Sequence, residues 1–152
     1  MVGSELAADS RSAVVLADSM GERVKSVLLN ALLVGSGGFV GSLCRYALGG
    51  AVHRHFPMAT FPYGTLAVNL LGCALIGALA GLADSRQLFS PELRTFGFIG
   101  ILGGFTTFST FGYETIAMAR DGEYIRAASN VGLHVVLGLG LVWLAYGLTS
   151  SR

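Results

Sequence analysis

The stretch that decides the fold is Gly103-Gly104-Phe105-Thr106-Thr107-Phe108-Ser109-Thr110-Phe111, in which a glycine pair is followed by hydroxyl and aromatic residues. It lies inside a run without Asp, Glu, Lys or Arg that extends from Thr95 to Tyr113. In hydrocarbon this pattern favours a helix break, because Gly is a weak helix former and hydroxyls can bond freed backbone groups. Breaks in membrane helices are tolerated only under cover of protein or a polar cavity, and they are common ion sites. We therefore expect a broken membrane helix.

The composition on either side of this stretch also indicates a membrane protein. Of the 152 residues, 53% are hydrophobic and 12% are charged, and the mean hydropathy is +0.65. The net charge of +1 gives no electrostatic footprint for nucleic acid, which we exclude as a partner. Four charge-free runs reach the ~18 residues of a spanning helix, namely 26–44, 55–83, 95–113 and 127–151. The sequence predicts an all-α membrane protein with four transmembrane helices, the third broken near Gly103 to Thr107.

The first 23 residues differ in character from the rest of the chain. They are polar, and their longest apolar stretch, Ala13–Ala17, is shorter than the ~7–15 residues of a signal-peptide core. We expect residues 1–23 to form a disordered polar tail and residues 24–150 to form one four-helix membrane domain that begins with a helix at Val24. Cys44 and Cys73 lack the paired spacing of a metal or redox motif, which favours reduced packing residues.

Charges near the predicted membrane surfaces are almost balanced. Arg23, Lys25, Arg86, Arg94 and Arg152 lie on one side and Arg45, Arg54, Arg120 and Arg126 on the other, which is five against four. Because an excess of Lys and Arg on one side sets orientation, this balance permits insertion both ways and an antiparallel dimer. One fixed orientation with a weak bias is the alternative, and charge alone leaves both open.

Three motifs, in order, resemble the Fluc (CrcB) fluoride channels of bacteria over about residues 35–147. They are Gly38-Phe39-Val40-Gly41-Ser42-Leu43-Cys44-Arg45-Tyr46, Gly64-Thr65-Leu66-Ala67-Val68-Asn69, and the stretch from Gly103 to Phe111. The resemblance implies a multi-pass protein of the bacterial plasma (inner) membrane. It further implies a dual-topology antiparallel homodimer that exports fluoride passively through two pores, with a structural sodium at its centre.

Candidate pore residues follow from fluoride chemistry and from the resemblance together. A small, strongly hydrated anion needs donors in place of its water, and neutral donors serve it without trapping it. Asn69 supplies an amide, while Thr65, Ser109 and Thr110 supply hydroxyls. Phe108 and Phe111 lie three residues apart on one face, and the resemblance assigns their electropositive ring edges to the anion path. Without the motifs, the Phe residues would be read as packing residues and Asn69 equally well as interhelical glue.

A sodium site is implied by the resemblance at the backbone carbonyls of Gly103 and Thr106. Carbonyl oxygens are hard ligands that suit sodium and that protonation cannot remove. Two antiparallel copies would supply a four-oxygen site on their two-fold axis. The alternative is a glycine-rich packing crossing without an ion.

Arg45 and His134 each allow two interpretations. Arg45 either attracts anions into a vestibule or extends to the membrane interface. The fourth helix departs from the family pattern of Tyr and Ser hydroxyls and carries Asn130 and His134 on the comparable face. His134 either donates to fluoride, which would make conduction pH-dependent, or packs as a neutral hydrogen-bonded residue.

Two other membrane functions and the enzyme class are alternatives to a channel. A small dual-topology, proton-coupled drug transporter would need a membrane carboxylate, for which Glu114 is the candidate. A noncatalytic assembly subunit would fit the small-residue pairs Gly37/Gly41, Gly77/Gly81 and Gly100/Gly104. An enzyme is not expected, because the sequence has no nucleophile triad, phosphate loop or Cys/His metal set in its loops.

Overall fold

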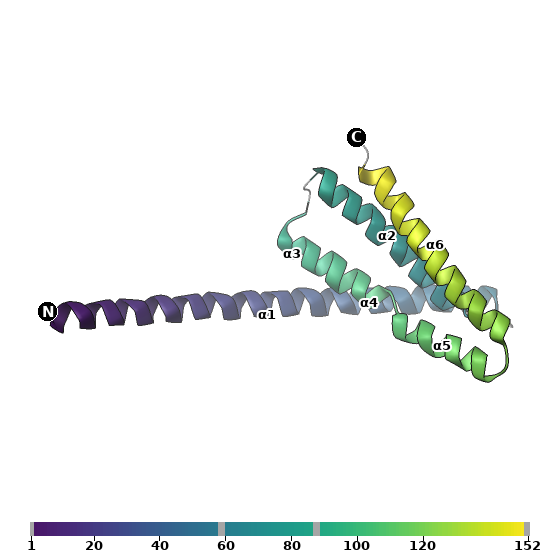
Figure 1. Ribbon diagram of the computed structural model, residues 1–152, viewed down its shortest axis with the longest axis horizontal. Coiled ribbons are helices and arrows are strands. Elements are labelled where there is room, and N and C mark those ends of the chain that lie inside the picture. Colours follow the sequence, from purple (N-terminus) through teal and green to yellow (C-terminus); the bar gives the residue numbers. More distant parts are fainter. Residues whose placement is uncertain (1, 58–59, 87–88, 151–152) are drawn as a thin grey trace.

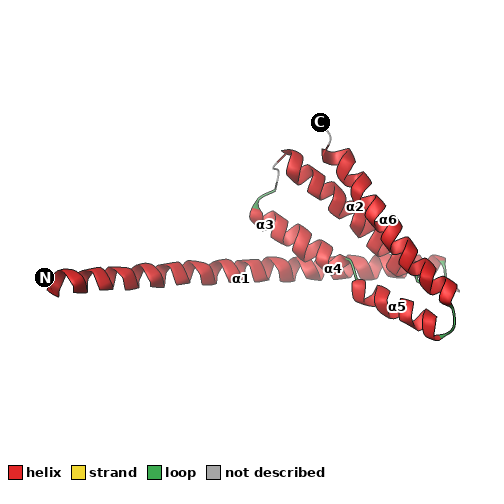
Figure 2. Cartoon of the chain, in the orientation of Figure 1, coloured by secondary structure: helices red, strands yellow, loops and turns green. Residues whose placement is uncertain are grey.

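The computed structural model describes residues 2–57, 60–86 and 89–150 and consists of helices joined by short connections. In chain order these are α1 (Val2–His55), α2 (Tyr63–Arg86), α3 (Pro91–Arg94), the π-helix η1 (Thr95–Leu102), α4 (Gly103–Phe105), α5 (Phe108–Arg120) and α6 (Tyr124–Ser150). Figure 1 shows α2 and α6 side by side, with α1 crossing the bundle and its N-terminal half extending away from it. Figure 2 shows the same helical path without a strand in the described residues.

Three segments are each long and apolar enough to cross a membrane: Asp18–His55, Tyr63–Ser85 and Tyr124–Ser150. The remaining predicted span is divided between α3, η1 and α4 on one side of a break and α5 on the other. These half-helices are individually too short to span, so the predicted third helix is present as a broken segment. Together with the outward-facing apolar side chains, such as Trp143 with 79% of its surface exposed, this identifies a multi-pass membrane protein.

The first helix is longer than the sequence predicts. We expect its start at Val24, whereas α1 is continuous from Val2 to His55. No proline interrupts this range, and its polar first part contains good helix formers such as Ala, Glu and Leu, which explains the continuity. Residues 18–32 are all exposed, so this part of α1 gains no packing from the bundle. The assignment of residues 1–23 to a separate tail stays a prediction, because the side chains of residues 1–17 lie outside the description.

The break itself falls two residues beyond the glycine pair. Gly103 is helical, with φ −62° and ψ −38°, whereas Thr106 and Thr107 are extended, with ψ of 159° and 108°. The break is therefore inside the predicted range, but the glycines are not its opened residues. A Cβ on Gly104 would lie 2.8 Å from the Gly38 Cα, so this glycine permits the backbone of α4 to contact α1.

Glycine also sets the contact between α2 and α6. A Cβ on Gly77 would lie 2.9 Å from the Cα of Val142, and one on Gly81 would lie 2.7 Å from the Tyr146 carbonyl oxygen. Gly37 and Gly100 oppose each other in the same way across α1 and η1. The three glycine pairs noted in the sequence thus pack within one chain, which removes them as an argument for an assembly surface.

Candidate functional site

The broken segment is closed by an amide clamp from α2. The Asn69 Nδ2 donates to the Thr107 carbonyl oxygen at 3.1 Å, and the Thr107 N–H donates to Asn69 Oδ1 at 2.9 Å. The Thr107 N–H is the group that would bond the Gly103 carbonyl in a continuous α-helix. Asn69 therefore satisfies the two opened backbone groups of Thr107 and leaves the Gly103 carbonyl without its usual donor.

Thr107 begins the second half-helix. Its hydroxyl accepts from the Thr110 N–H at 3.3 Å as the N-cap of α5, and it also contacts the Thr110 hydroxyl at 2.9 Å and the Ser109 hydroxyl at 3.4 Å. A helix N-terminus carries a positive partial charge, which favours an anion near it. The break therefore presents capped donors at the start of α5, while the Gly104 and Thr106 carbonyls at the end of α4 accept from Ser42 and Arg45.

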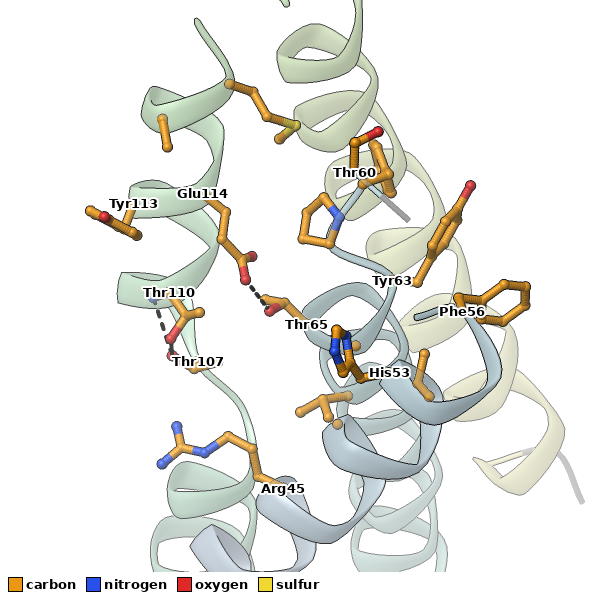
Figure 3. Close-up of a pocket in the computed structure, with 18 of the residues that line it drawn as sticks. Arg45, His53, Phe56, Thr60, Tyr63, Thr65, Thr107, Thr110, Tyr113 and Glu114 are labelled. Carbon is orange, nitrogen blue, oxygen red and sulfur yellow. Dashed lines mark hydrogen bonds between the residues drawn. The ribbon is translucent and has the colours of Figure 1, made fainter. Parts of the chain in front are cut away.

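Two cavities adjoin this clamp, and Thr107 lines both. Cavity A, of about 670 Å³, brings together Arg45, Thr65, Thr110 and Glu114 (Figure 3). In this cavity the Thr65 hydroxyl donates to Glu114 Oε1 at 2.8 Å, while Glu114 Oε2 is buried without a partner in the described part of the chain. The sequence indicates Glu114 as a membrane carboxylate and Thr65 as a candidate pore hydroxyl, but it does not indicate that the two are bonded to each other.

Arg45 reaches the break from α1. Its Nη1 donates to the Thr106 carbonyl oxygen and its Nη2 to the Ser42 hydroxyl, each at 3.5 Å. Arg45 shares cavity A with Glu114, yet it forms no ion pair with any side chain that the structure describes in residues 18–57, 60–85 and 89–150. The guanidinium therefore bonds the Thr106 carbonyl of the break and the Ser42 hydroxyl, and not an acid.

Cavity B, of about 550 Å³, brings together Asn69, Phe108, Phe111 and His134, and the described residues that line it include no Asp, Glu, Lys or Arg. The Phe108 and Phe111 ring centroids are 5.4 Å apart, and 82% of the Phe108 surface is exposed. The ring of His134 lies 4.4 Å from that of Phe111. An uncharged cavity with amide and aromatic edges is suited to a small anion that must not be trapped.

A series of hydrogen bonds connects Phe111, one of this aromatic pair, to α6. The Thr115 hydroxyl donates to the Phe111 carbonyl at 2.8 Å, Asn130 Nδ2 donates to the Thr115 hydroxyl at 2.8 Å, and His134 Nδ1 lies 2.9 Å from the Asn130 carbonyl. Asn130 is fully buried, and neither cavity is lined by it. Asn130 is thus placed to hold α5 against α6, and Thr115 is a participant that the sequence analysis missed.

The carbonyls implied for sodium are placed differently from each other. Gly103 is exposed, with open space where a side chain would be, and it lines cavity B. Thr106 lines the same cavity, but its carbonyl accepts the long bond from Arg45. Hard carbonyl oxygens fit a sodium ion in type, and two from one chain are too few to enclose it, so such a site would need a second copy.

Comparison with known proteins gives a consistent result. Residues 32–146 match the family model described as "CrcB-like protein, Camphor Resistance (CrcB)". A protein of Methylobacillus flagellatus named "Fluoride-specific ion channel FluC" is 44% identical over 77% of this chain and 91% of its own length. A protein of Chlorobaculum tepidum with the same name is 48% identical over 77% of this chain and 91% of its own length. Both are named as channels, so the expectation that the chain is not an enzyme is confirmed at the level of its family.

Proposed function

This chain belongs to the CrcB-like family, and we propose that it is a fluoride-selective channel that lowers cytoplasmic fluoride by passive export across the bacterial inner membrane. The observation that carries the proposal is cavity B. Its described lining combines the Asn69 amide with the Phe108 and Phe111 rings and contains no carboxylate that would repel an anion. A dehydrated anion in such a site is held by dipoles and ring edges, which allows it to leave again.

The path that we propose uses the residues on both sides of the clamp. Arg45, Thr65 and Thr110 in cavity A form the vestibule, and the start of α5 directs positive partial charge toward the break. Asn69, Phe108 and Phe111 form the narrow part, with Ser109 hydrogen-bonded to Thr107 at its edge. His134 continues the path along α6 in place of a hydroxyl track, and the buried Asn130 holds its ring through the bond to the Asn130 carbonyl.

The functional unit that we propose is an antiparallel homodimer in the lipid bilayer with two pores. The near balance of loop charge supports insertion of the chain in both orientations. A structural sodium at the dimer centre would be held by the carbonyls of Gly103 and Thr106 from each copy, where it would fix the two broken helices against each other. The exposed Gly103 and its carbonyl, released by the Asn69 clamp, support this site.

The test is fluoride efflux from proteoliposomes that contain only this purified chain, measured with a fluoride electrode and compared with chloride efflux. We expect rapid loss of fluoride without a proton gradient and no loss of chloride. Phe111→Ile keeps bulk but removes the ring quadrupole, and it should slow efflux. Leu139→Ile, which changes an exposed residue of the same cavity without removing a ring, is the matched control.

A proton-coupled drug transporter is the second candidate, and one observation favours it. Glu114 is a membrane carboxylate with a buried, unpartnered Oε2 in a cavity large enough for a small organic cation. In that case Glu114→Gln should abolish export of a cationic dye, and a proton gradient should be required. For a channel, fluoride flux should proceed with the gradient collapsed.

A further inference from the structure

The hydrogen bond of His134 fixes how its ring faces cavity B. A carbonyl oxygen can only accept, so the 2.9 Å contact with the Asn130 carbonyl places the hydrogen of the neutral ring on Nδ1. Nε2 is then a lone pair, and it is buried without a partner in the described residues. A neutral His134 therefore offers an anion no donor from Nε2, and its lone pair repels negative charge.

A proton on Nε2 reverses both properties. The ring then donates from both nitrogens and carries a positive charge, while its bond to the Asn130 carbonyl is kept. In a cavity of low dielectric, an imidazolium beside a dehydrated halide forms a neutral unit. The ring centroids of Phe111 and His134 are 4.4 Å apart, and both residues line the cavity. The His134 ring and the Phe111 ring therefore lie at the same point of the proposed path.

The surroundings leave this proton without a competing partner. Of the elements packed around His134, α2 contributes the Cys73 thiol as its titratable group in cavity B, and the described lining from η1, α4 and α6 contributes no other. The acid of α5, Glu114, lines cavity A instead and bonds Thr65. No carboxylate in the described lining of cavity B would therefore hold a protonated His134 in place of a mobile anion.

We infer that His134 forms a binding site for a small hard anion that exists only when its ring is protonated, so that protons control fluoride passage through cavity B. The inference rests on the proposed channel function and names its regulation. Flux through the site therefore rises with the fraction of chains in which His134 carries the second proton.

The experiment compares fluoride efflux at about pH 6 and about pH 8.5 for three proteins, after subtraction of the leak from protein-free vesicles. The parent should be at least about tenfold faster at the lower pH. His134→Gln supplies a neutral donor that does not titrate, and its two rates should agree within about twofold. His55→Gln is the matched control, because His55 makes the same bond to the carbonyl four residues earlier, at 3.0 Å, but is exposed and should keep the parent ratio.

A parent with equal rates at the two pH values, or a His134→Gln variant that retains the full ratio, would overturn the inference. Absence of fluoride flux from all three proteins at both pH values would instead refute the channel function. A second measurement decides the binding step without flux. At one fixed pH in lipid nanodiscs, added fluoride should increase the ¹⁵N signal of the protonated His134 ring, which it stabilises, and an unchanged signal would exclude the site.

Discussion

Replacement of Asn69 by Leu tests the amide clamp, because Leu is similar in size and has no polar atoms. The change removes the bonds of 3.1 and 2.9 Å to Thr107 and leaves its N–H and carbonyl without partners at membrane depth. Each orphaned buried group costs about 1–3 kcal/mol, so the free energy of unfolding should fall by about 2–6 kcal/mol. Fluoride flux should fall by about tenfold or more, because the break loses its shape and the cavity its amide donor.

Stability would be measured by reversible unfolding in detergent micelles and flux by electrode in proteoliposomes of the same preparation. Cys73→Ala is the control: it lies one turn further along α2 and lines the same cavity, and it should cost about 1 kcal/mol or less. An Asn69→Leu protein as stable as the control would show that the clamp does not hold the break. A stable variant with parent flux would refute both roles of Asn69.

The remaining predictions concern the aromatic pair, the helix contact and the topology. Phe108→Ile and Phe111→Ile should each slow fluoride efflux while leaving size-exclusion profiles unchanged, and parent rates in both would reject the aromatic path. Gly77→Ala should destabilise the protein by about 1–3 kcal/mol, because the added Cβ meets the α6 backbone. Gly140→Ala is the control, since Gly140 faces open space and the change should not destabilise the protein. Equal melting temperatures of the two variants would contradict this packing. A variant with three added Lys in the 84–94 loop should insert in one orientation and lose activity. Co-expression with a variant that carries added Lys at 120–126 should restore activity. Full activity of the first variant by itself, with labelling that shows one orientation, would exclude the antiparallel dimer.

The helices could be predicted from local signals in the sequence, whereas the exact position of the break could not. Ser90 caps α3 with Pro91 in its first turn, and the Asp121-Gly122 pair ends α5 with Gly122 at φ 80°, both as the residue types indicate. The position of the break could not be read from propensity alone. Asn69, which lies 38 residues earlier in the chain, binds the backbone of Thr107, and that contact decides which residues open.

The register of the hairpin formed by α5 and α6 encodes two contacts of the site. Thr115 with Asn130, and Phe111 with His134, are each centred on the point between Gly122 and Glu123 in the turn that joins α5 to α6. In an antiparallel helix hairpin, residues equidistant from the turn face each other, so the register alone would have paired them. The Thr65 bond to Glu114 has no such signal, because it joins helices that are not consecutive.

The zero-current voltage across a planar bilayer that contains only the purified chain tests fluoride conduction most directly. With a tenfold fluoride gradient, equal chloride and equal pH on the two sides, the current through a passive fluoride channel should reverse at ~59 mV. The sign of this voltage should be that of an anion moving down its gradient. The voltage should not change when chloride or protons are made unequal. A reversal near zero under the fluoride gradient, or one that follows the chloride or proton gradient, would contradict the account.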